Sequence, residues 1–299
     1  TDTIVVLNLS DRATVLEVPT EEITPYPDQE IKSISFNNSD DDLFLVVSRK
    51  ASRVWDLKTG EILASINHEK YEDKIITGKI SPDGKWIASG SDSIKDRTRV
   101  GPGGSSPVLV NANLRIININ NGNVYKKFDH KNHVSFMKFS PDGRYLLSVY
   151  NQPTWPTGSG PPKTISFIRV YDTSNWKERF TNEYSQVIKS ANFSPDSNLI
   201  ALSLSDSQTY SRGDKEGWNT AVINTKKGKE IISIDHPNDV IDSIISPDMK
   251  SIGIATSGGV FSIYNLSTGE KYGEINHKHS IDSFDISPDS KWVAVGGLD

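Results

Sequence analysis

Histidine and aspartate residues recur toward the carboxyl end of the chain, where they could carry metal-binding or acid-base chemistry. Imidazole and carboxylate groups are zinc ligands, and they are also common general acids and bases. The candidate residues are His236, Asp242, His277, His279, Asp282 and Asp285. Their spacing matches no strong metal-binding signature. One interpretation is therefore a hydrolase or lyase site, or a site that senses a small molecule or glycan.

Composition excludes several other kinds of chemistry. The chain has 299 residues and no Cys, which rules out disulfides, thiol catalysis and cysteine metal sites. Its formal charge of -5 argues against a nucleic-acid groove, because phosphate binding needs clustered Lys and Arg. No apolar run approaches the roughly 20 residues of a membrane helix. We expect no nucleic-acid partner, no membrane insertion, no bound metal and no cofactor.

The elements that would position these residues are indicated by a short repeated phrase. Ser-Pro-Asp occurs five times, at residues 81–83, 140–142, 194–196, 246–248 and 287–289. Each copy stands between two stretches of alternating apolar residues. Pro presets the first central φ of a turn, and Asp tolerates the next position. Each phrase therefore predicts a hairpin between two strands.

A second phrase follows each of the first ones along the chain. It is an apolar pair followed by Asp or Asn, then a tight turn, with anchors at Asp56, Asn118, Asp172, Asn224 and Asn265. Each copy predicts a third strand, a turn and a fourth strand. The amino terminus carries the same phrase at Asn8, before any matching first half, whereas the carboxyl end supplies only a first half.

The two repeated phrases together predict an all-β fold. We expect a six-bladed β-propeller of four-stranded antiparallel blades, with the last blade closed by the N-terminal strands. Residues 1–299 then form a single domain. The predicted blades are residues 31–67, 74–129, 134–181, 187–235, 240–276, and 281–299 together with 1–18.

The anchors are 41 to 62 residues apart, and the shortest of these spacings matches the period of WD repeats. The four-stranded units also resemble the WD-repeat family in Val54-Trp55-Asp56-Leu57, in the Ser-Pro-Asp turns and in the Asp235-His236 and Asn276-His277 steps. Only one unit retains Trp-Asp, and no His follows Gly, so we expect the inter-strand polar network of the family to be degenerate. The resemblance implies a scaffold that binds a protein or peptide partner. Such modules often stand beside other domains in a longer chain.

Three connections between second and third strands are much longer than the others, roughly residues 91–113, 151–163 and 206–219. They share exposed aromatic or Arg residues, the types that dominate binding energy at interfaces. These residues, which we call the lip, are Arg97, Arg99, Trp155, Tyr210, Arg212 and Trp218. We expect the lip to bind the partner; the alternative is tolerated insertions that pack on one another.

Two further observations favour a binding function over catalysis. Four His residues recur after the fourth strands, at 68, 130, 236 and 277, and recurrence at a repeat position is typical of a structural role. The positions expected to face the central channel are Ser35, Lys79, Lys138, Asn192, Ile244 and Asp285. They form no ring of carboxylates. We therefore expect a polar, water-filled channel and a protein that is not an enzyme.

The chain starts at Thr1 without Met, which indicates processing or excision from a longer protein. We expect a cytoplasmic location, with the periplasm and the cell exterior as open alternatives.

Overall fold

A computed structural model describes residues 3–7, 14–19, 31–37, 42–48, 51–67, 74–92, 112–154, 163–206 and 217–297. The chain divides into two compact units, unit 1 at Thr1–Phe139 and unit 2 at Ser140–Asp299. Every regular element in the described ranges is a β-strand. The predicted all-β fold is confirmed.

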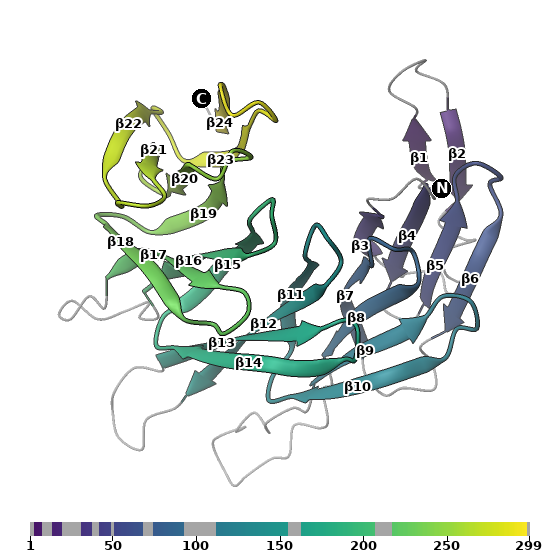
Figure 1. Ribbon diagram of the computed structural model, residues 1–299. Helices are drawn as coiled ribbons and strands as arrows, with labels where there is room; N and C mark the ends of the chain where they lie inside the picture. The colour runs from purple at the N-terminus through teal and green to yellow at the C-terminus, as the bar shows by residue number, and fades with distance from the viewer. Residues whose placement is uncertain are drawn as a thin grey trace, which may run out of the picture. The chain divides into compact units, whose positions relative to one another are not determined.

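Unit 1 contains two four-stranded antiparallel sheets, a separate hairpin and one further strand (Figure 1). The hairpin pairs β1 with β2, the sheets follow the orders β3-β4-β5-β6 and β7-β8-β9-β10, and β11 ends the unit. The bounds are β1 Thr3–Leu7, β2 Thr14–Pro19, β3 Ile31–Phe36, β4 Leu43–Ser48, β5 Ala51–Asp56, β6 Ile62–Asn67, β7 Lys74–Ile80, β8 Trp86–Asp92, β9 Ala112–Asn118, β10 Val124–His130 and β11 Val134–Phe139.

Unit 2 repeats the same antiparallel arrangement. Strands β12 to β14 pair in chain order, followed by the sheets β15-β16-β17-β18 and β19-β20-β21-β22 and the pair β23-β24. The bounds are β12 Tyr145–Thr154, β13 Lys163–Asp172, β14 Lys177–Tyr184, β15 Val187–Phe193, β16 Leu199–Ser205, β17 Trp218–Asn224, β18 Glu230–His236, β19 Val240–Ile245, β20 Ser251–Thr256, β21 Val260–Asn265, β22 Lys271–Asn276, β23 Ile281–Ile286 and β24 Val293–Gly297.

The Ser-Pro-Asp phrases form tight turns for a specific chemical reason. In every copy the Ser hydroxyl donates to the Asp carboxylate two residues on, at 2.6–2.7 Å. The same oxygen accepts the backbone N–H five residues on, at 2.9–3.0 Å. The fourth residue of each turn has a positive φ, whether it is Gly84 or Gly143 or, in later copies, Ser197, Met249 or Ser290. The predicted turns are confirmed.

The second phrase also forms a turn that its own side chain stabilises. The Asp or Asn anchor accepts the backbone N–H two residues on, at 2.7–3.0 Å, at Asp56, Asn118, Asp172, Asn224 and Asn265. Four of these turns place Gly at positive φ, at residues 60, 122, 228 and 269. These are Asx turns, and each joins the third and fourth strands of its group.

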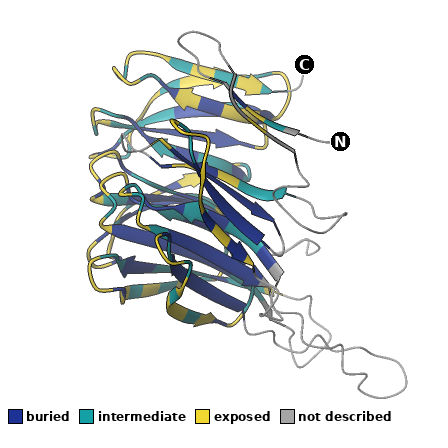
Figure 2. Ribbon diagram, turned by 90° about the vertical axis from the view of Figure 1, so that its right-hand side faces the viewer, coloured by how far each residue is buried: buried dark blue, intermediate teal, exposed yellow. Residues whose placement is uncertain are grey.

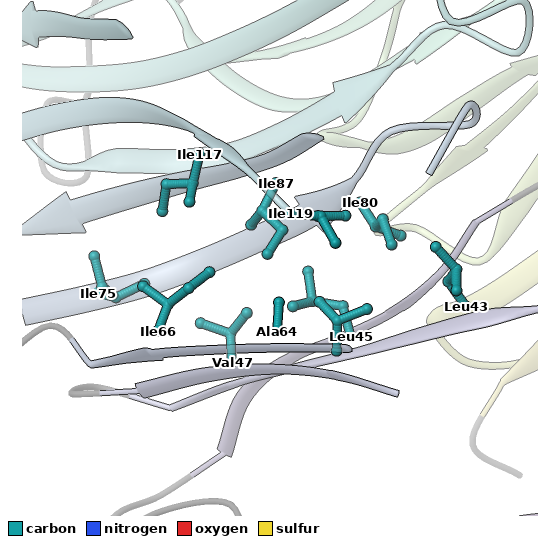
Figure 3. Packing of buried hydrophobic residues seen from close by; sticks show 11 residues of the cluster. Leu43, Leu45, Val47, Ala64, Ile66, Ile75, Ile80, Ile87, Ile117 and Ile119 are labelled. Atoms are coloured by element: carbon teal, nitrogen blue, oxygen red, sulfur yellow. The ribbon is translucent and has the colours of Figure 1, made fainter. Parts of the chain in front are cut away.

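The core of unit 1 lies between its two four-stranded sheets (Figure 3). Apolar side chains from β4 to β9 fill it: Leu43, Leu45, Val47, Val54, Ala64, Ile66, Ile75, Ile80, Ile87, Ile117 and Ile119. The sheets approach closely at Gly78, where an added Cβ would stand 2.7 Å from the Cγ2 of Val47. Inner strands such as β4 are buried throughout, whereas outer strands such as β6 alternate between buried and exposed residues (Figure 2).

In unit 2 the sheets pack in the same way. One buried cluster joins the sheet of β15 to β18 to that of β19 to β22, with Val222, Ile234, Ile252 and Ile254 among its members. A second cluster joins β20 and β21 to β23 through Phe261 and Phe284, whose ring centroids are 4.8 Å apart. The sheet of β19 to β22 thus buries both faces against its neighbours, which is how propeller blades bury their apolar surface.

In chain order the described strands form five groups of four, with β1-β2 and β23-β24 as two half groups, which is the strand pattern predicted for six blades. The closure of these two halves into one blade, and the single domain that closure would complete, stay predictions.

Candidate functional site

The three long connections leave from one end of their sheets. They join β8 to β9, β12 to β13 and β16 to β17, which are second-to-third connections as predicted. In an antiparallel sheet these connections lie at the end opposite the Ser-Pro-Asp and Asx turns. Most lip residues lie outside the described residues, namely Arg97, Arg99, Trp155, Tyr210 and Arg212.

Trp218 is the lip residue that the structure describes. It is the first residue of β17, pairs with His236 on β18 and is half-buried. Its ring packs against the apolar cluster of Val222 and Ile234. Part of the Trp218 side chain therefore packs in the core, and the rest lies at the base of the long connection.

Hydrogen bonds fix the strand ends from which these connections leave. In unit 1, Ser91 and Asn113 exchange two bonds, Asn113 N–H donating to Ser91 Oγ at 3.0 Å and Ser91 Oγ to the Asn113 carbonyl at 3.2 Å. In unit 2, Ser166 Oγ donates to Asn151 Oδ1 at 2.6 Å, and Gln186 Nε2 donates to Asn219 Oδ1 at 2.7 Å. The connections thus start from ordered bases.

His236 is buried within unit 2. Its Nε2 lies 3.1 Å from Thr220 Oγ1, and its ring meets the ring of Tyr264 edge-on with centroids 5.8 Å apart. Burial lowers the pKa of His236 to about 4, against a weaker opposing effect of the Asp235 carboxylate. The ring is neutral at physiological pH, and these contacts serve the packing of β17, β18 and β21.

The other residues of the predicted acidic site are only partly brought together. Asp242 and Asp282 line one cavity of about 70 Å³ with Ala255 and Phe284. Asp242 accepts hydrogen bonds from Asn192 Nδ2 and from the N–H of Ser243, both at 2.8 Å. His236, His277, His279 and Asp285 are not among the residues that line this cavity.

His277 and Asp285, two other residues of the predicted acidic site, each contact a backbone group within two residues in the sequence. His277 Nδ1 lies 3.2 Å from the carbonyl of His279, and Asp285 Oδ1 accepts the N–H of Ile286 at 2.8 Å. Within the described ranges no group of three or more His, Asp or Glu residues could hold a metal ion. The predicted residues therefore form no metal centre in the part of the chain that the structure describes.

A larger cavity lies in unit 1. It measures about 200 Å³ and its lining includes Ser35, Lys79 and Lys138, three of the positions expected to face the channel. The sequence identified these side chains as polar and inward-facing. It did not indicate that they share one open volume, which depends on how closely β3, β7 and β11 approach one another.

The strand order, the two kinds of turn and the packing of sheet on sheet define a protein of the β-propeller class. A structural comparison agrees: the hydrazine synthase of Kuenenia stuttgartiensis aligns with a TM-score of 0.61 at 13% identity, over 98% of this chain and 86% of that chain. At this identity the likeness shows the fold alone.

The family model of the WD domain, G-beta repeat, matches residues 61–96, 122–152 and 269–299. With the propeller-type sheets, these three matches are consistent with the resemblance to WD-repeat β-propellers that the sequence motifs indicated. A comparison with curated proteins found no match. Among the described residues, no helix has the length and apolar character needed to cross a membrane.

Proposed function

We propose that this chain is a non-enzymatic scaffold that binds a protein or peptide through the lip of its three long connections. WD-repeat propellers commonly mediate interactions between proteins, and the family match supports that general role. The observation that carries the finer proposal is the position of the long connections, which all join second to third strands in three successive groups. Long connections on a rigid scaffold are where binding residues concentrate.

The ordered bases of the connections support this proposal. Ser91 and Asn113 exchange hydrogen bonds next to the ends of β8 and β9, and Ser166 bonds to Asn151 three residues inside the ends of β13 and β12. A loop anchored at both ends loses less conformational entropy on binding than one with free ends, which favours affinity. Trp218 adds an aromatic ring at one base, already packed against the core.

The contacts of Asp242 and His236 favour binding over catalysis. Asp242 accepts two hydrogen bonds from the protein itself, and His236 is buried against Thr220 and Tyr264. A general base must reach the proton it removes, and a buried His with these contacts is poorly placed to do so.

Affinity capture with immobilised protein tests the proposal. The lip variant carries Trp155→Ala, Tyr210→Ala, Arg212→Ala and Trp218→Ala together. The control carries Lys226→Ala, Lys227→Ala and Lys229→Ala in the exposed turn between β17 and β18, at the opposite end of the same sheet. Quantitative mass spectrometry compares what each protein retains from a lysate of the source organism, after unfolding curves have shown that both variants fold.

We expect at least one protein to be retained by the wild type and by the control, and to fall at least tenfold with the lip variant. A loss of this size corresponds to the removal of one or two interface hot spots. If the lip variant retains the same proteins in the same amounts as the wild type, the lip does not bind them and the proposal is wrong.

A further inference from the structure

The cavity of unit 1 stands where three first strands end. Strands β3, β7 and β11 end at Phe36, Ile80 and Phe139, and each of these residues contributes to the cavity wall. Among the described residues the lining is Ser35, Phe36, Lys79, Ile80, Pro82, Lys138 and Phe139. Pro82 belongs to the Ser-Pro-Asp turn between β7 and β8, so the cavity lies at the turn end of the strands.

Contacts between the strands fix this geometry. β7 contacts both β3 and β11. Ser33 Oγ of β3 donates to the carbonyl of Gly78 on β7 at 2.7 Å. Gly78 has no side chain, and this lets β7 approach Val47 of β4 closely. Lys79 follows Gly78 directly and is held in register by its pairing with Ala88.

The cavity carries concentrated positive charge. Lys79 and Lys138 are both half-buried, and neither Asp nor Glu is among the residues that the structure shows lining the cavity. Burial lowers the pKa of Lys79, because the ammonium group loses hydration. Lys79 is thus a partly desolvated charge, and Lys138 adds a second positive charge to the lining of the same cavity, in a chain whose net charge is -5.

The remaining lining suits the rest of a small ligand. The Ser35 hydroxyl donates to the Phe36 carbonyl at 3.3 Å, a long bond that rotation of the hydroxyl releases. Phe36, Ile80, Pro82 and Phe139 provide apolar wall. A volume of about 200 Å³ is below that of sites for drug-sized molecules and fits a compact ligand.

We propose that this cavity binds the oxyanion of a small organic phosphate or carboxylate, with Lys79, Lys138 and Ser35 as its polar contacts. Lys is an effective partner of phosphate as a compact point charge, and bonds between two charged groups are among the strongest hydrogen bonds. The bound oxyanion offsets the desolvation of the Lys79 ammonium group. The apolar wall then contacts the body of the ligand.

This site is separate from the proposed lip. Within the sheets of unit 1 it lies at the turn end of the strands, whereas the long connection between β8 and β9 leaves from the other end. The inference therefore goes beyond the binding of a protein partner, and either proposal can fail without the other.

Thermal unfolding and titration calorimetry with defined probes test the inference. The probes are inorganic phosphate, phenyl phosphate and benzoate, each compared with NaCl at equal ionic strength because salt screens charge unspecifically. A ligand at ten times its dissociation constant should raise the Tm by about 2–4 °C. If the phosphates bind and benzoate does not, the ligand is a phosphate. If benzoate binds and the phosphates do not, the ligand is a carboxylate. Either result supports an oxyanion site.

Variants locate the site. Lys79→Met and Lys138→Met each remove one ammonium group and keep the stem of the side chain, and each should weaken the binding of the responding probe at least tenfold. The matched control is Lys85→Met, whose exposed ammonium group lies 3.5 Å from Asp83 on the same turn. It should bind like the wild type. If all three probes shift the Tm no more than NaCl does, or if all variants bind equally, the inference is overturned.

Discussion

Equivalent positions in the two units make opposite use of a polar residue. In unit 1, Lys79 is the penultimate residue of β7 and lines a cavity of about 200 Å³. In unit 2, Asn192 is the penultimate residue of β15, and its Nδ2 bridges to β19 by donating to Asp242 Oδ1 at 2.8 Å and to the Ser243 carbonyl at 2.9 Å. One side chain faces open volume, whereas the other links two strands.

The repeat therefore determines where a side chain points. The type of residue at that position determines whether a binding site results. A neutral amide with a carboxylate acceptor completes its hydrogen bonds inside the protein. Lys79 instead lines a cavity to which Lys138 also contributes, and positive charge on a cavity wall favours the binding of an anion. The hydrogen bonds of Asn192 are therefore structural, whereas we propose that the cavity of unit 1 takes a ligand.

The largest expected effect concerns the structural polar groups of unit 2. Burial lowers the pKa of His236 from 6.5 to about 4, so the folded state resists protonation that the unfolded state accepts. The stability that neutral His236 contributes is fully present above pH 6.5 and is lost as the pH falls to about 4. The free energy of unfolding should drop over this window by about 3 kcal/mol on account of this residue.

Urea unfolding of wild type and His236→Gln at several pH values measures this effect. Gln can still bond to Thr220 but does not titrate, so its curve should be flatter by the stated amount between pH 6.5 and 4. Parallel curves for the two proteins would show that His236 is accessible to protons in the folded state, and unit 2 would then resemble unit 1 more closely than we describe.

An intermediate effect is expected at the bridge between β15 and β19. Asn192→Leu removes both donors and leaves the carboxylate of Asp242 and the carbonyl of Ser243 without this partner. The free energy of unfolding should fall by about 1–3 kcal/mol, the usual cost of leaving such groups unsatisfied. Chemical denaturation measures it. Unchanged stability would mean that the bridge has no structural role.

The smallest expected change in the free energy of unfolding is an increase rather than a decrease. Lys79→Met removes a partly desolvated charge, so in phosphate-free buffer it should raise the free energy of unfolding by about 0.5–1 kcal/mol. Lys85→Met, at an exposed pair with Asp83, should change it by less than about 0.5 kcal/mol. Destabilisation by Lys79→Met would assign Lys79 to the structure and remove the contrast with Asn192.

Much of the fold followed from local chemistry in the sequence. The Ser-Pro-Asp and Asx turns could be predicted because each is completed by a side chain within five residues of its partner, as Ser194 is with Asp196 and Leu199. The order of strands and the second-to-third location of the long connections then followed from the repeats. The exchange of bonds between Ser91 and Asn113 lies beyond that local range.

The candidate sites could not be predicted in the same way, because they depend on contacts between residues far apart in the sequence. Asp242 and His236 were candidates for catalysis because their residue types fit, but their partners, Asn192 and Thr220, come from other strands. The inward positions of Lys79 and Lys138 followed from alternation along the strands. Their common cavity did not, because its volume is set by the approach of β7 to β3 and β4 through Gly78.

The titration of Lys79 itself tests the contrast between the units most directly. Lysine side chains labelled with ¹³C report the protonation of each ammonium group by NMR, and Lys79→Met assigns the signal. We expect the pKa of Lys79 to lie below its ordinary value in phosphate-free buffer and to rise when the responding oxyanion probe is added, because a bound anion favours the charged ammonium. A pKa that the probe leaves unchanged would contradict the account.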